Sequence, residues 1–160
     1  MEEWQKEWEN KPEDEWPVVI GSGLKVIMIH RLTAWEQRYI PGTLFFESLD
    51  KNGEKIGGLK IQVETESDPN GNIYDHQDVW GRVGVTKGRL GYAEYVHLQK
   101  PTIYIVRFGE DGDNLAIGNL RTDLGNEYPT PAGSNRPASY VPTCRPGIYS
   151  YRIIIQELDQ

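Results

Sequence analysis

The sequence is poor in cysteine, and it has no excess of positive charge. Cys144 is the single cysteine among 160 residues. No internal disulfide can therefore form, and a zinc site built mainly of cysteines is excluded. Acidic residues outnumber basic ones by 24 to 17, which gives a net charge of −7. Such a balance offers no electrostatic footprint for nucleic acid or for an anionic membrane, so we expect neither as a partner.

Long apolar runs are also missing. No stretch reaches the ~18 residues that a membrane-spanning helix needs. The N-terminal segment MEEWQKEWENKPEDEW is acidic and lacks the apolar core of a signal peptide. We therefore expect synthesis in the reducing cytoplasm without a secretion signal, which suits a chain without disulfides. Cell lysis or incorporation into a virion would still bring such a protein to the outside, for example to a virion surface.

What the sequence has in quantity is the pattern of β-strands. In residues 59–65 Leu, Ile and Val alternate with Lys, Gln and Glu, which predicts one buried and one solvated face. Asn52-Gly53, just upstream, suits a tight hairpin turn. Similar runs recur at a spacing typical of a sandwich or barrel, and they span residues 24–32, 43–49, 59–65, 78–85, 91–98, 102–108, 115–122 and 148–158.

These runs predict an all-β chain, an Ig-like antiparallel sandwich of seven to eight strands that occupies residues 17–160. No segment after the N-terminal region shows a helical period over ten or more residues. The apolar positions of the strands supply the expected core, to which we assign Leu44, Phe46, Leu59, Ile61, Val63, Val96, Ile103, Ile105 and Ile153.

Residues 1–16 differ from the rest, because three tryptophans stand among charged residues. Trp4 and Trp8 are four residues apart, so a short helix would show both on one face. One interpretation is a flexible terminus. We favour a short N-terminal arm whose Trp4 and Trp8 bind a neighbouring subunit, because exposed tryptophan pairs are costly without a partner. The main competitor is that both tryptophans pack on their own sandwich.

Residues 123–147 form the second exception, because five prolines in 25 residues prevent regular strand pairing. This long Pro-rich loop carries Tyr128, Arg136 and Tyr140. It is either a crossover between sheets, packed as a compact loop, or a recognition loop carried on a rigid sandwich. The second interpretation makes these three residues candidates for partner binding.

Motifs for catalysis, cofactors or metals are not evident. There is no Gly-x-Ser-x-Gly elbow and no phosphate-binding loop, and Cys144 has no histidine nearby in the sequence. Residues 68–75 offer four oxygen ligands, but their spacing departs from a calcium loop, and Asp and Asn are common turn formers. We therefore expect a turn without an obligatory metal at Asp68, Asn70, Asn72 and Asp75, with a Ca²⁺ site as the alternative. We predict no catalytic residue, no cofactor and no enzymatic activity.

The stretch TLFFESLDKNGEKIGGLKIQVE (43–64) resembles the opening hairpin of Ig-like and transthyretin-like, or carboxypeptidase-regulatory-like, β-sandwich modules. Such a hairpin has an Asp-x-x-Gly turn between two strands, here at 50–53. Residues 87–108 resemble the later strand pair of these modules. More loosely, 24–158 is similar to uncharacterised Ig-like modules encoded by phages and bacteria. The resemblance implies binding or assembly, and it carries over no catalytic residue.

We therefore expect a non-catalytic structural protein, a phage virion component such as a capsid decoration or a tail-associated protein. It would contact other virion or lattice subunits, and homo-oligomers fit this role. The first alternative is a carbohydrate-binding module for cell-surface glycan, with aromatics on an exposed sheet face. The second is a small hydrolase with an unrecognised site. The strand aromatics available for a platform are Trp80, Tyr92, Tyr95, Tyr104, Tyr149 and Tyr151.

Overall fold

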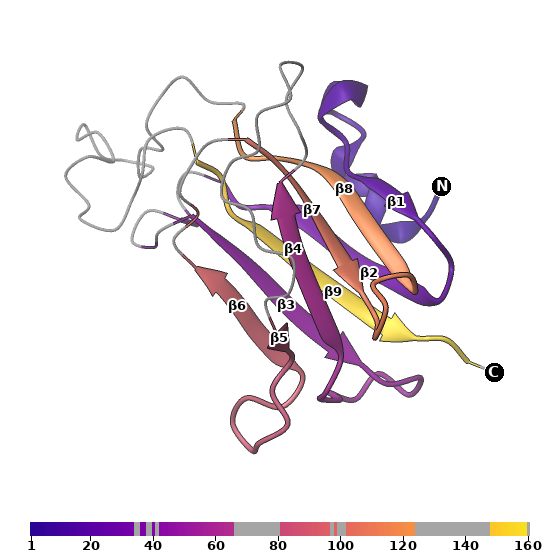
Figure 1. The fold of residues 1–160 in the computed structure, drawn as a ribbon. Helices are drawn as coiled ribbons and strands as arrows, with labels where there is room; N and C mark the ends of the chain where they lie inside the picture. Colours follow the sequence, from indigo (N-terminus) through magenta and orange to yellow (C-terminus); the bar gives the residue numbers. More distant parts are fainter. Residues whose placement is uncertain are drawn as a thin grey trace.

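The chain folds into two packed β-sheets with two short 3-10 helices at its N-terminus (Figure 1). The computed structural model describes residues 1–33, 36, 37, 40, 42–65, 81–96, 98, 102–123 and 148–159. Its elements in chain order are η1 (Glu3–Trp8), η2 (Glu13–Glu15), β1 (Val18–Ile20), β2 (Leu24–Arg31), β3 (Thr43–Leu49), β4 (Lys60–Thr65), β5 (Gly81–Arg82), β6 (Tyr92–Val96), β7 (Ile103–Phe108), β8 (Leu115–Arg121) and β9 (Tyr151–Glu157).

One sheet has five strands in the order β1-β8-β7-β4-β5, and the other has four in the order β2-β9-β3-β6. This arrangement confirms the all-β sandwich. The expectation of purely antiparallel pairing is wrong at one place, because β3 and β9 run parallel, with Phe46 opposite Ile153. Among the described residues, no helix is long and apolar enough to cross a membrane.

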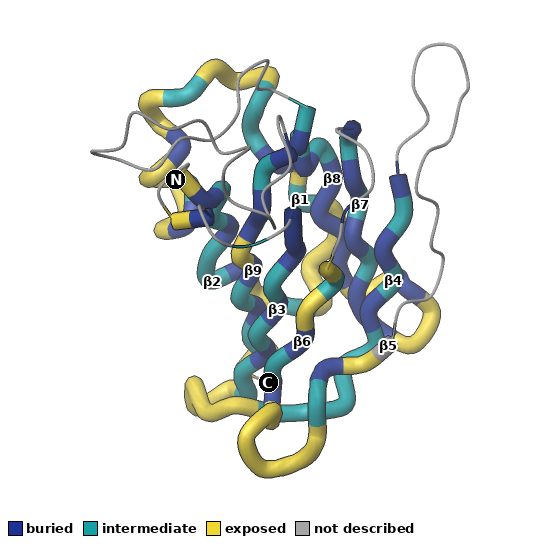
Figure 2. The backbone as a smooth tube through the Cα atoms, turned by 90° about the vertical axis from the view of Figure 1, so that its left-hand side faces the viewer, coloured by how far each residue is buried: buried dark blue, intermediate teal, exposed yellow. Residues whose placement is uncertain are grey.

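Alternation along the strands builds the core between the sheets. In β4, Ile61 and Val63 are fully buried while their neighbours are half exposed, as the sequence pattern predicts. Phe46 of β3 meets Phe108 of β7 edge to face, with ring centroids 6.0 Å apart and planes at 80°. Figure 2 shows the resulting dark blue positions recurring along the paired strands. The core is thus a layer of side chains shared by both sheets.

Three of the expected core residues face elsewhere. In β7 the inward residues are Tyr104, Val106 and Phe108, so Ile103 and Ile105 are only half-buried on the opposite face. Nearly every residue of this strand is apolar, so its sequence alone does not show which alternate set faces inward. Val96, at the end of β6, is 43% exposed because it lies on the outer face of the sheet with Glu94 and Tyr92, whereas Ala93 of the same strand faces the core.

The expected hairpin between residues 43 and 65 forms only in part. The Asp50 carboxylate accepts hydrogen bonds from the backbone N–H groups of Asn52 and Glu54, and Gly53 has φ +86°, so the turn itself is present. The chain then leaves β3, and β4 joins the other sheet. Gly57 lies at this crossover, where a Cβ would collide with the carbonyl oxygen of Gly84.

Candidate functional site

The two tryptophans expected to bind a partner lie in the core of their own chain. Trp4 is 5% exposed and Trp8 is fully buried, although both belong to the short helix η1 close to the N-terminus. The Trp8 indole N–H donates to the carbonyl oxygen of Ile29 in β2 over 2.7 Å. The expectation that this pair waits for another subunit is therefore wrong.

Trp8 is held there by rings and cations from several elements. Its ring stacks on Tyr151 of β9, with centroids 6.4 Å apart and planes at 7°. The Lys11 ammonium and the Arg31 guanidinium lie 5.1 and 5.7 Å from its centroid, within cation–π range. Arg31 also forms an ion pair with Glu15 over 3.0 Å. Residues 1–16 are thus an integral part of the packing of the sandwich.

The other predicted site residues cannot be placed. Tyr128, Arg136 and Tyr140 lie outside the described residues, as do the oxygen ligands of 68–75 and Trp80. Of the remaining strand aromatics, Tyr104 and Tyr151 are buried in the core, and Tyr95 is partly buried against it. Tyr92 is half-buried on β6 and lines a groove.

This groove lies on the outer face of the four-stranded sheet and has a volume of about 570 Å³. The sheet register puts two rows of side chains there, His30-Arg152-Phe45-Glu94 and Met28-Ile154-Glu47-Tyr92. Arg152 donates to the Glu47 carboxylate over 2.8 Å, and the Tyr92 hydroxyl donates to Glu94. Burial and the neighbouring Glu94 raise the pKa of Tyr92, so it remains a neutral donor. Aromatic faces beside polar groups suit a ligand with both apolar and hydroxylated surfaces.

His30 closes one end of the groove and joins three segments of the chain. Its Nδ1 lies 2.7 Å from a Glu7 carboxylate oxygen in η1, and its Nε2 lies 2.8 Å from Glu36. Ionised carboxylates only accept hydrogen bonds, so both ring nitrogens must carry a proton, which makes the ring an imidazolium. Burial opposes this charge, but the two carboxylates outweigh it and raise the pKa of His30.

We expect this cluster to make stability pH-dependent. Because its folded pKa lies above the ordinary 6.5, His30 stabilises the fold below that pH and loses this contribution as the pH rises through the folded value. Burial alone would raise the pKa of Glu36, but hydrogen bonds from Thr33 and His30 lower it below 4.5, so its contribution is lost on acidification. The advantage of the wild type over His30→Gln should therefore be largest from about pH 5 to 6.5 and should shrink by pH 9.

Thermal unfolding of both proteins across this pH range measures the difference. Glu64→Gln is the matched control, because it removes an ion pair with Arg107 that contains no histidine. Its destabilisation, measured across the same pH range, gives the baseline for an ion pair without histidine. A His30→Gln difference that depends on pH no more than this baseline would show that the imidazolium does not form.

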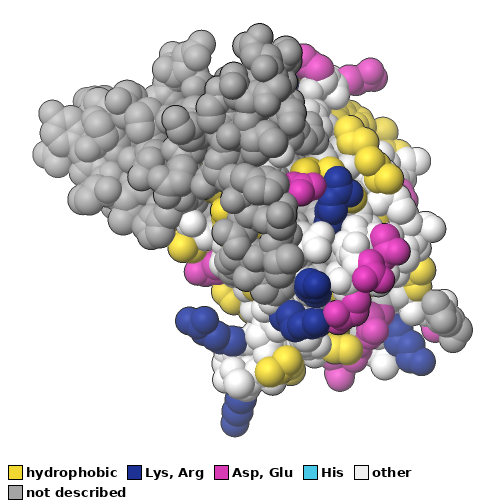
Figure 3. Space-filling view, viewed as in Figure 1, with side chains coloured by type: hydrophobic (Ala, Val, Ile, Leu, Met, Phe, Trp, Pro, Cys, Tyr) yellow, Lys and Arg dark blue, Asp and Glu magenta, His cyan; other side chains and the backbone are white. Residues whose placement is uncertain are grey.

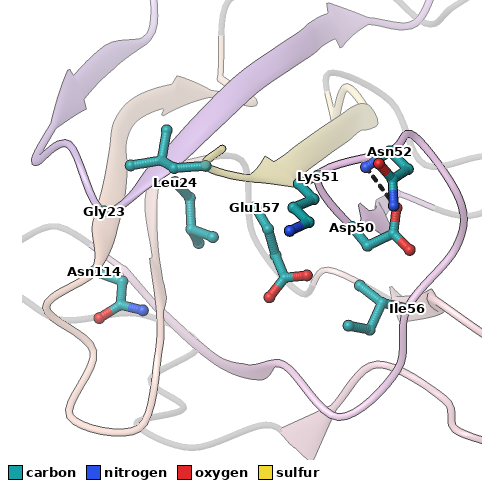
Figure 4. A pocket seen from close by; sticks show the side chains of 9 residues that line it. Gly23, Leu24, Asp50, Lys51, Asn52, Ile56, Asn114 and Glu157 are labelled. Atoms are coloured by element: carbon teal, nitrogen blue, oxygen red, sulfur yellow. Dashed lines mark hydrogen bonds between the residues drawn. The ribbon is translucent and has the colours of Figure 1, made fainter. Parts of the chain in front are cut away.

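A second hollow, of about 580 Å³, lies at the other end of the sandwich (Figure 4). Glu157, Lys51 and Asn114 line it together with Asp50, whose carboxylate is already used by the turn. Within the described ranges, no group of three or more His, Cys, Asp or Glu side chains is placed to hold a metal ion. This hollow is polar, and its groups are mostly turn-forming, so we assign it no chemistry.

Two exposed apolar side chains stand on the loop that connects β5 of the five-stranded sheet to β6 of the four-stranded sheet; we call this segment, residues 84–91, the hairpin. Val85 is 68% exposed and Leu90 is 40% exposed. Residues 82–91 also carry three basic residues and no acidic one, in a chain whose net charge is −7. Arg82 pairs with Glu110, but within the described part of the chain no ion pair or side-chain hydrogen bond involves Lys87 or Arg89.

The sequence pattern predicts strands over 78–85 and 91–98, and it assigns no contact surface to the residues around 84–91. A signal is present in the sequence, because residues 82–91 carry three cations and no acidic residue, which is unusual in an acidic chain. Beside the hairpin, Arg89, Ala93 and Val96 line a groove of about 450 Å³ along the outer edge of β6. In Figure 3 the corresponding corner, at the lower left, carries Lys and Arg side chains beside hydrophobic ones.

Comparison of the chain with protein families, with curated proteins and with solved structures finds no match. The function is therefore inferred from the geometry of these surfaces.

Proposed function

We propose that the chain is a non-catalytic structural protein that makes protein–protein contacts in a larger assembly, namely a phage virion on which it is a capsid decoration or a tail-associated component. Membership of the Ig-like modules belongs to the same proposal. The observation that carries it is the hairpin 84–91, where exposed Val85 and Leu90 stand beside the cations Lys87 and Arg89, which form no ion pair with any residue that the structure describes. Exposed apolar residues next to charges without partners are typical of a protein–protein interface in its unbound state.

The fold supports this role in a second way. A sandwich with long-range strand pairing holds its hairpins rigidly, so a contact loop keeps its shape before binding and loses little entropy on docking. The local turn bonds within the hairpin point the same way, because the N–H of Arg89 donates to the carbonyl of Thr86 and that of Tyr92 to the carbonyl of Arg89.

The test is to look for the protein in particles. Phage particles purified by density gradient, from the source that encodes the chain, are analysed by mass spectrometry, and antibody against the chain is used for immunogold labelling. We expect the protein in the particle fraction at a fixed ratio to the major shell protein. Neighbouring genes for capsid and tail proteins would agree with this result. Absence from the particles, with the protein recovered only in the soluble fraction, would reject the virion role.

A carbohydrate-binding module is the second candidate, and the groove with Phe45, Tyr92 and Arg152 favours it. Sugar rings stack on aromatic faces while their hydroxyl groups bond to charged side chains. Binding to purified cell-wall polysaccharide is measured by calorimetry for the wild type, Tyr92→Ala and Arg152→Ala. Lys25→Ala, an exposed cation of the same sheet outside the groove lining, is the control. Loss of binding in the two groove variants alone would support this candidate.

A further inference from the structure

The basic hairpin has a counterpart at the opposite edge of the same sheet. We define the hairpin patch as Val85, Leu90, Lys87 and Arg89. The exposed large apolar residues of the described chain are few, and two others, Val18 and Ile20, both belong to β1. They are 50% and 59% exposed, so β1 presents an aliphatic pair like that of the hairpin.

Acidic side chains accompany the aliphatic pair of β1. Glu13 and Asp14 of η2 are exposed just before the strand, and no ion pair or side-chain hydrogen bond within the described ranges engages either carboxylate. Asn119 fixes this segment to β8, because its amide donates to the carbonyl oxygens of Asp14 and Trp16, both over 2.9 Å. We define the β1 patch as Val18, Ile20, Glu13 and Asp14. Figure 3 shows hydrophobic side chains over this region, at the upper right, with acidic ones above them.

The two patches cannot meet within one molecule. The strand order β1-β8-β7-β4-β5 puts β1 at one edge of the five-stranded sheet, and the hairpin patch follows β5 at the other edge. Figure 1 shows the same separation, with β1 at the right and the loop after β5 at the lower left. Two surfaces that match in apolar content and oppose in charge, but that lie on opposite sides, can join only between copies.

We propose that the hairpin patch docks on the β1 patch of a second copy of this chain, so that copies join head to tail. Such a heterologous contact uses different surfaces on the two partners, and it generates a ring or an open row rather than a two-fold dimer. Lys87 and Arg89 of one copy face Glu13 and Asp14 of the next, and the aliphatic pairs fill the centre of the contact. This inference rests on the proposed assembly function and names its partner.

The experiment measures self-association of the full-length protein by sedimentation velocity over a concentration series. Reversing the charges of one patch, with Lys87→Glu and Arg89→Glu together, puts like charges across the contact. We expect the association constant to fall by at least about tenfold at low ionic strength, since each 1.4 kcal/mol is worth a factor of ten. Glu13→Lys with Asp14→Lys should have the same effect. Salt should weaken the wild-type contact.

The decisive measurement is made on a mixture of the two charge-reversed variants. Each reversed variant should stay monomeric alone, while an equimolar mixture of the two should associate, because every contact between unlike copies then pairs opposite charges. Lys25→Glu with Lys51→Glu is the matched control, since it changes the net charge as much as the hairpin reversal does, at exposed lysines outside both patches. The control should associate more strongly than the hairpin variant. Melting temperatures near the wild-type value would show that all variants are folded.

Two results would overturn the inference. One is a wild-type protein that is monomeric at every concentration and ionic strength tested. The other is self-association that the reversed variants and their mixture leave at the level of the control. Neither result touches the proposed function, because the detection of the protein in particles is a separate measurement, and a protein could decorate a shell through a contact with another subunit.

Discussion

Trp8→Ala should unfold the protein at a much lower temperature than the wild type. Trp8 is fully buried, stacks on Tyr151 and donates its indole N–H to the carbonyl of Ile29. Truncation of a buried tryptophan removes a large apolar contact and costs about 3–5 kcal/mol. It also leaves the Ile29 carbonyl without this donor. For a chain of this length the loss corresponds to a fall in Tm of roughly 6–20 °C, measured by circular dichroism at the strand signal.

Deletion of residues 1–15 should destabilise the sandwich in the same way, because it removes Trp4 together with Trp8. Trp8→Phe keeps an aromatic ring but loses the donor, so its Tm should lie between those of the wild type and Trp8→Ala. Leu158→Ala, at a residue 38% exposed, is the control and should change the free energy of unfolding by no more than about 0.5 kcal/mol. If the protein without residues 1–15 has the same Tm as the wild type, the N-terminal segment does not pack on the sandwich and is better described as a detached arm.

The contrast at the N-terminus shows what composition can hide. The tryptophans, charges and prolines of residues 1–16 are typical of a flexible segment, and the spacing of Trp4 and Trp8 correctly indicates one shared face. The sequence does not say what that face covers. The answer depends on β2 and β9, whose Ile29 and Tyr151 stand far away in the chain. Long-range partners of this kind leave no local pattern.

The strands themselves were largely predictable, because alternation is a local property. Ile61 and Val63 face the core as expected, but β7 does not follow the predicted register. Where both faces of a strand are apolar, only the pairing with neighbouring strands decides which face is buried. In β7, Val106 lies opposite the buried Val63 of β4 and therefore faces the core with it. The alternating pattern also does not show which of the two sheets a strand joins. The turn at Asp50 forms as its sequence requires, yet the chain then crosses to the other sheet.

Surface function was the least predictable part. The expected contact residues are the two N-terminal tryptophans and three residues of a Pro-rich loop that lies outside the described residues, while the contact surface that we propose is a small aliphatic and basic hairpin. Val85 and Leu90 look like ordinary strand residues in the sequence, and their exposure follows only from where β5 ends and β6 begins. Lys87 and Arg89 indicate a contact surface only because they form no ion pair within the described residues, which the sequence alone does not show.

Phe46→Ala and Phe108→Ala should each lower the free energy of unfolding by about 3–5 kcal/mol, as expected for fully buried rings. The two rings come from different sheets and meet edge to face at 6.0 Å, so each truncation also removes a partner of the other. The double variant should therefore lose less than the sum of the single losses. The expected coupling is about 0.5–1.5 kcal/mol, the usual worth of an aromatic pair beyond its buried area.

Chemical denaturation of the four proteins of this double-mutant cycle gives the coupling directly. Phe45→Ala is the matched control, because it removes the same side chain from the same strand on the outer, half-exposed face. Its cost should be clearly smaller than that of Phe46→Ala. If the two cost the same, the side-chain register of β3 would be wrong, and the outer-face groove that contains Phe45 would be lost with it. If the two core losses simply add, Phe46 and Phe108 do not contact each other, and the two sheets must be held together by other residues of the core.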